Sequence, residues 1–88
     1  ELFKEAINPS YKLKIDFGDL GILKSSAQIT KNYTIKMLVN FQVIAIVNFP
    51  KKQIANFMSE CLVLGVVQGD SVVLITPNNK IANGLKIA

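Results

Sequence analysis

The chain has 88 residues, half of them hydrophobic, and its ten lysines outnumber its six acidic residues, which gives a net charge of +4. This length allows one domain, residues 1–88, and the absence of histidine and arginine excludes histidine-based nucleophilic catalysis, histidine metal sites and bidentate contacts to guanine. The positive charge favours a polyanionic partner such as a nucleic acid, although ordinary solubility explains a charge of this size equally well.

The first half of the chain predicts two strands and a short helix. Residues 11–17 alternate strictly between apolar and polar side chains, which is typical of a half-buried strand. Residues 22–29 are expected to form a second, irregular strand. Thr34 is a suitable N-cap for a helix over residues 35–39, and Asn40 is a reasonable stop signal.

The second half is dominated by apolar runs. Residues 41–49 lack alternation, which predicts a strand buried on both faces. A polar loop is expected over residues 51–56 and a buried strand over residues 57–67. The turn chemistry of residues 68–71 predicts a hairpin that pairs this strand with residues 72–75.

Five short strands and one short helix around a single core predict a mainly β domain. A five-stranded Greek-key barrel of the oligonucleotide-binding (OB) type fits this count, and a small β-sandwich fits it almost as well. Cys61 is the only cysteine and lies in an apolar run, so we expect a small buried side chain. A small secreted domain would normally carry several cysteines, which favours a cytoplasmic location.

Several stretches of the chain follow one known pattern in their order and spacing. They are YKLKIDFG at 11–18, KSSAQIT at 24–30, VNFP at 47–50, FMSECLVLG at 57–65 and NGLK at 83–86. Together they resemble the CsaA family, which is related to the tRNA-binding domains of some aminoacyl-tRNA synthetases. The resemblance implies an OB barrel, a homodimer, tRNA binding and a chaperone activity on unfolded export precursors. In that family an apolar strand precedes the point where this sequence opens, so we expect the first barrel strand to be incomplete.

The candidate nucleic-acid-binding residues are lysines that would hold phosphates, together with polar and sulfur-containing side chains that would contact sugars or base edges. They are Lys12, Lys14, Ser25, Ser26, Gln28, Asn48, Lys51, Lys52, Met58, Ser59 and Glu60. The alternative for the lysines is a solvated face, and the alternative for the serines and Glu60 is hydrogen bonding to backbone groups. Phe49 and Phe57 are able to stack on bases, but packing in the core or in a dimer is the favoured interpretation of both.

Two functions follow from these residues, and they are compatible with each other. The first is tRNA binding through phosphate and shape contacts, without a cofactor, a metal or a catalytic residue. The second is chaperone-like binding of unfolded precursor polypeptides in secretion, which the hydrophobic content favours. An enzyme is the least favoured class, because the six carboxylates are scattered and no histidine is present to activate a nucleophile.

Overall fold

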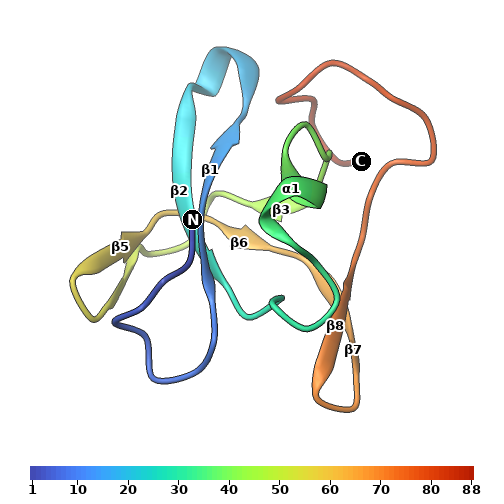
Figure 1. Cartoon of the computed structure of the whole chain (residues 1–88). Coiled ribbons are helices and arrows are strands. Elements are labelled where there is room, and N and C mark those ends of the chain that lie inside the picture. The colour runs from blue at the N-terminus through green and yellow to red at the C-terminus, as the bar shows by residue number, and fades with distance from the viewer.

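The computed structural model describes residues 1–88 and contains mainly β structure with very little helix. Its short strands pair into four antiparallel two-stranded sheets, and the one α-helix is α1 (Ile35–Leu38). The strands are β1 (Tyr11–Asp16), β2 (Ile22–Ala27), β3 (Ala45–Ile46), β4 (Lys52–Ile54), β5 (Phe57–Ser59), β6 (Leu62–Val63), β7 (Gly65–Gln68) and β8 (Ser71–Leu74). In Figure 1, β1, β2 and β5 lie on the left, and β7 and β8 lie at the lower right. The prediction of a mainly β domain is confirmed.

β1 and β2 form the longest ladder, joined by a 3-10 turn at Gly18–Leu20. Their register pairs Tyr11 with Ala27 and Asp16 with Ile22. Because side chains alternate across a sheet, Tyr11 and its neighbours two residues on face the interior, while the lysines face solvent. The period-two pattern therefore predicted this strand correctly, and β2 ends at Ala27, two residues before the predicted boundary.

The helix α1 begins as predicted. The Thr34 side-chain oxygen accepts a hydrogen bond from the backbone N–H of Met37 at 3.3 Å, which satisfies a donor that the first helical turn leaves free. The helix ends at Leu38, and Asn40 follows with a positive φ of 63°. A helix this short is unstable alone, and Leu38 packs against the core cluster formed by Tyr11, Ile29 and Leu74.

Three predictions about the second half are wrong. In residues 41–49 only β3 is a strand, paired with β6, and no residue is buried, so the predicted strand with two buried faces is absent. The expected loop over residues 51–56 instead contains β4, which pairs with β5 through a tight turn at Ala55, where φ is 51°. The expected single strand over residues 57–67 is divided into β5, β6 and β7.

The hairpin of β7 and β8 is confirmed, with Gln68 opposite Ser71 across the predicted turn. The separation of the ladders into four sheets does not confirm a closed five-stranded barrel. Tyr33 links the sheets instead: its carbonyl accepts from the Tyr11 hydroxyl at 2.8 Å, and its own hydroxyl accepts from the Leu74 N–H at 2.9 Å. Cys61 is 1% exposed and unpaired, as the sequence predicted.

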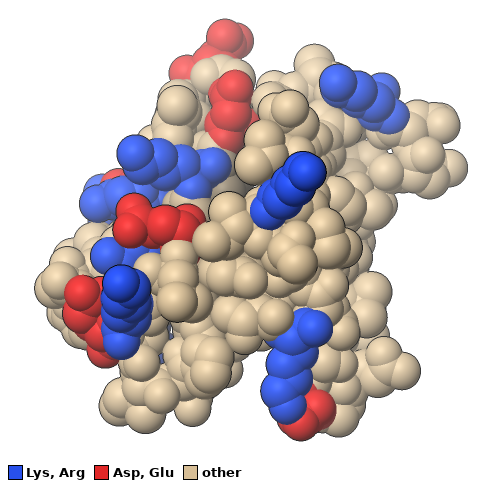
Figure 2. All heavy atoms as spheres, in the orientation of Figure 1, with Lys and Arg blue, Asp and Glu red and all other residues tan.

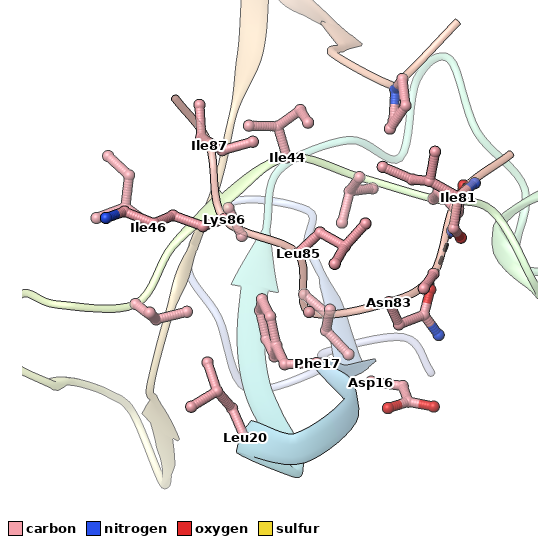
Figure 3. A pocket seen from close by; sticks show the side chains of 18 of the residues that line it. Asp16, Phe17, Leu20, Ile44, Ile46, Ile81, Asn83, Leu85, Lys86 and Ile87 are labelled. Carbon is pink, nitrogen blue, oxygen red and sulfur yellow. Dashed lines mark hydrogen bonds between the residues drawn. The ribbon is translucent and has the colours of Figure 1, made fainter. Parts of the chain in front are cut away.

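The segment after β8 has no regular structure and crosses the end of β1. Gln42 holds it by donating to the Ile81 carbonyl at 2.6 Å and accepting from the Ile81 N–H at 3.1 Å. The backbones touch at Gly84, where an added Cβ would overlap the Phe17 carbonyl oxygen. Under this crossing lies a largely apolar cavity of about 530 Å³. Figure 3 shows its walls, which include Phe17, Leu20, Ile44, Ile46, Leu85 and Ile87.

Candidate nucleic-acid interface

Three lysines share the solvent-facing side of the β1–β2 ladder. Lys12 and Lys14 alternate with apolar residues along β1, and Lys24 lies directly opposite Lys14 on β2. Lys14 and Lys24 are exposed and form no ion pair, whereas Lys12 lies 3.8 Å from a Glu5 carboxylate oxygen. Like charges directly opposite each other destabilise an antiparallel ladder. A bound anionic ligand would reduce this repulsion between Lys14 and Lys24.

Phe57 on β5 adds an aromatic ring to this face. The Nζ atoms of Lys12 and Lys24 lie 5.6 and 5.4 Å from the centroid of the Phe57 ring. Behind Phe57, the buried ring of Phe3 lies 5.3 Å away, centroid to centroid. Phe57 does pack, as the sequence favoured, yet it is only half buried and adjoins the lysines. We define the basic face as Lys12, Lys14, Lys24 and Phe57.

Lys24 was missed by the sequence-based site prediction. The available signal was the β1–β2 register, because a hairpin turn centred on residues 18–21 places Lys24 opposite Lys14. Figure 2 shows lysines and acidic residues gathered on the left of the molecule, where Figure 1 places β1, β2 and β5. The remaining lysines are scattered over the rest of this view.

Glu60 lies at the edge of the basic face and binds β2 directly. Its Oε1 accepts from the Lys24 backbone N–H at 2.9 Å, and its own N–H donates to the Lys24 carbonyl at 2.7 Å. Its Oε2 lies 3.5 Å from the Lys51 Nζ. The hydrogen bond from Lys24, assisted by the charge of Lys51, holds the pKa of Glu60 below its ordinary value. Lys51 is therefore partly neutralised by an ionised carboxylate.

Two of the three predicted serines on β2 and β5 point inward, whereas Ser26 lies opposite Lys12 on the other face of the ladder. Ser25 and Ser59 are buried, and both hydroxyls donate to the Cys61 carbonyl, at 2.8 and 3.3 Å. The Ser59 hydroxyl also accepts from the Ser26 N–H at 3.3 Å. Burial raises the pKa of the Cys61 thiol. The hydroxyls of Ser25 and Ser59 join β2 to the segment around Cys61. This is the backbone hydrogen bonding that the sequence analysis gave as the alternative role of the serines.

The other predicted site residues are exposed and lie on separate segments. Lys52 begins β4, where it pairs with Ser59, and Met58 on β5 is 37% exposed. Gln28 follows β2 directly, whereas Asn48 lines the apolar cavity. The structure therefore brings Lys12 and Lys14 together with Lys24 and Phe57, and it does not gather all the predicted residues at one point.

Groups of metal-ligating side chains, charged cavities and membrane-spanning helices would point to other kinds of function. The structure contains no group of three metal-ligating side chains from His, Cys, Asp and Glu. The apolar cavity has only two charged residues in its lining, Asp16 and Lys86. No helix is both long enough and apolar enough to cross a bilayer. The basic face is thus the best candidate site for a charged ligand.

Comparison with known proteins identifies the family of the chain. A family model described as "Putative tRNA binding domain" (tRNA_bind) matches residues 4–86. Among solved structures, the chain is similar to the chaperone CsaA of Bacillus anthracis strain Ames, with 53% identity and a TM-score of 0.95. It is also similar to the CsaA chaperone protein of Picrophilus torridus, with 57% identity and a TM-score of 0.92. Each match covers 100% of this chain and 81% of the other.

The resemblance predicted from the five sequence stretches is therefore confirmed over nearly the whole chain. The two structural matches have the same overall path as this chain, and the family model begins and ends within a few residues of its ends. The chain belongs to the tRNA-binding domain family, and within it is of the CsaA type.

Proposed function

We propose that this chain binds tRNA on the basic face. The observation that carries the proposal is the convergence of Lys12, Lys14 and Lys24 beside the half-exposed ring of Phe57. Lysine ammonium groups bind phosphates as point charges and do not read base edges in the manner of arginine. Binding would therefore depend on charge and on the shape of the RNA. Family membership supports this function, and we assign the chain no catalytic role and no cofactor.

The remaining predicted residues would have different parts in this function. Lys52, Gln28 and Met58 are exposed and would extend the contact beyond the basic face, and Asn48 would do so from the side of the cavity. Lys51 would contribute less than its charge suggests, because Glu60 already pairs with it. Ser25 and Ser59 would hold β2 in place, since their hydroxyls bond within the protein. Ser26, opposite Lys12 on the ladder, would offer its hydroxyl to the ligand.

The test is a salt titration of binding to bulk tRNA. The double variant Lys14→Ala with Lys24→Ala should weaken binding about 10-fold at low salt and reduce the slope of log affinity against log salt by about 2. The control, Lys36→Ala with Lys80→Ala, removes the same charge from α1 and the C-terminal segment and should leave the slope nearly unchanged. Equal effects of the two double variants would contradict the proposed location, and absence of binding at any salt would contradict the function.

The proposal extends to the fold and the assembly. We propose that the four sheets form an open version of the OB barrel, supported by hydrogen bonds that cross between them. The Ile44 N–H donates to the Ile75 carbonyl at 3.2 Å, and the Glu60 N–H donates to the Lys24 carbonyl. We also propose a homodimer in the cytoplasm. The exposed apolar pair of Val66 and Val73 on β7 and β8 supports a partner-covered surface, and the lone buried cysteine supports the compartment.

A second candidate function is chaperone-like binding of unfolded precursor polypeptides. The apolar cavity favours it, because the lining residues Leu85 and Ile87 are both 60% exposed and therefore open to an apolar peptide. Suppression of aggregation of an unfolded client should depend weakly on salt and should decrease in the variant Leu85→Asn with Ile87→Asn. Unchanged client aggregation at stoichiometric amounts of this chain would exclude the activity.

A further inference from the structure

We infer that the basic face binds an unpaired nucleotide, with its base stacked on Phe57 and its flanking phosphates held by Lys14 and Lys24. This inference rests on the proposed binding of tRNA and specifies which part of an RNA the site takes. It assigns to Phe57 a direct contact with the ligand, whereas the sequence favoured a packing role for this residue.

The Phe57 ring is held in a fixed position. The Phe3 ring behind it is 2% exposed, and the two rings are tilted by 59° at a centroid distance of 5.3 Å. β5 is paired with β4, where Phe57 lies opposite Ile54 next to the tight turn at Ala55. A ring supported by a buried aromatic and a paired strand loses little freedom on binding a ligand, so stacking on it is entropically inexpensive.

Two flexible cations adjoin the ring in the free protein. The Nζ atoms of Lys12 and Lys24 lie within 6 Å of the Phe57 centroid, which is the range of a cation–π contact. A nucleotide offers an aromatic base and a phosphate together. The base can take the place of the Lys24 ammonium group on the ring while this group moves to the phosphate, so the lost contact is replaced by another.

The lysines have the spacing of a nucleic-acid backbone. Lys12 and Lys14 are two residues apart on one strand, which places them about 7 Å from each other, and Lys24 faces Lys14 across the ladder. Successive phosphates of an extended strand can contact such a row in turn. The exposed lysines Lys14 and Lys24 form no ion pair, so an incoming phosphate displaces no carboxylate from either of them.

Stacking on Phe57 requires a base that is not stacked on both of its faces already. Bases within an RNA duplex are covered by their neighbours, whereas bases in loops and at ends can turn outward onto an aromatic side chain. The basic face contains no arginine to read base edges. The ligand is therefore an unpaired segment of RNA, bound with weak preference for sequence.

The test compares an unstructured RNA of about 12 nucleotides with a hairpin duplex of similar length. Phe57→Leu should weaken binding of the single strand about 5- to 100-fold and change binding of the duplex little, and Phe57→Tyr should preserve both. The matched control is Phe41→Leu, because Phe41 is also partly exposed at 37% and adjoins another ring, that of Tyr33 at 6.0 Å. Equal losses for both RNAs, or no loss for the single strand, would overturn the inference.

A second measurement needs no variant. A single strand carrying 2-aminopurine should lose fluorescence when its base stacks on the ring of the unaltered chain, and unchanged or increased emission would overturn the inference. These measurements distinguish failure of the proposed tRNA binding from failure of the role given to Phe57. If the unaltered chain binds neither tRNA nor either short RNA, the proposed function fails. If tRNA binds with an affinity that Phe57→Leu leaves unchanged, only the role of Phe57 fails.

Discussion

Glu60 lies where the basic face meets the interior of the protein. Its carboxylate accepts from the backbone of Lys24 and pairs with Lys51, so one side chain fixes β2 and also lowers the positive charge available to a ligand. The sequence placed Glu60 among the ligand-binding residues, with hydrogen bonding to backbone groups as the alternative, and did not indicate Lys24 or Lys51 as its partners. The contact with Lys24 joins residues 36 positions apart, a separation at which a single sequence carries no pairing signal.

Glu60→Gln should raise the affinity for RNA. Glutamine retains an oxygen that can accept from Lys24, while the ion pair with Lys51 is lost and the net charge increases. Because an exposed ion pair contributes little, the expected increase is about 2- to 5-fold, measured in the same tRNA titration. Asp19→Asn is the control, since it removes one carboxylate that forms no ion pair. A weaker affinity in Glu60→Gln would show that the carboxylate itself contacts the ligand.

The same residue predicts a dependence of stability on pH. The pKa of Glu60 is lowered from the ordinary value of 4.5 by the Lys24 hydrogen bond and by Lys51. The folded state therefore binds fewer protons, so the stabilisation is present above pH 4.5 and is lost as pH falls through the lowered value. Denaturation midpoints in urea should decrease below pH 4.5 more in the unaltered chain than in Glu60→Gln. Parallel curves would mean that the carboxylate contributes nothing to folding.

Elements whose signals lie within a few residues of one another could be predicted from the sequence, whereas contacts between residues distant in the sequence could not. The alternation over residues 11–17, the N-cap Thr34 and the turn at 68–71 each have a physical signal within a few residues, and the structure contains β1, α1 and the β7–β8 hairpin. The break after β5 has no such signal, because it follows from side chains that bond to β2 across the fold. Predicting the basic face would have required the register between β1 and β2, and the only signal for that register was the position of the hairpin turn.

The crossing of the C-terminal segment over β1 depends on the close approach at Gly84. Gly84 and Gly21 both have a φ of 84°, but an added Cβ at Gly84 would overlap the Phe17 carbonyl, whereas at Gly21 it would meet no atom within 4 Å. Gly21→Ala should therefore lose about 1–3 kcal/mol from backbone strain alone, because its φ of 84° with a ψ of −160° is a conformation that is essentially limited to glycine. Gly84→Ala should lose more, as measured by urea denaturation. Equal losses of stability in the two variants would mean that the C-terminal segment can shift away from Phe17 without loss of stability.

At the scale of the whole molecule, little of the surface is removed from water. Only 8 of 88 residues are buried, and large apolar side chains such as Val67 and Leu85 are 76% and 60% exposed. A domain of this size has a small margin of stability even when its core is complete. Exposed apolar surface of this extent is typical of a chain that a second subunit covers, which agrees with the hydrophobic content of the sequence.

The proposed homodimer gives a direct expectation for the mass in solution. Static light scattering at tens of micromolar should give twice the mass of the chain, and raising the salt concentration should leave this value unchanged because apolar contacts are insensitive to screening. A mass equal to one chain at this concentration would reject the dimer. Dissociation by salt alone would instead indicate association through the lysines and carboxylates.

The hydrogen bonds that Ser59 and Glu60 make to β2 also limit what else the strand can do. The N–H groups of Lys24 and Ser26 point away from β1, and the Glu60 carboxylate and the Ser59 hydroxyl occupy them. An unsatisfied strand edge is a template for adding strands from other molecules, the first step of fibril growth. Here the two polar side chains occupy the free N–H groups of β2, so another molecule cannot add a strand at this edge. The edge is therefore protected from fibril growth in a protein that exposes much apolar surface.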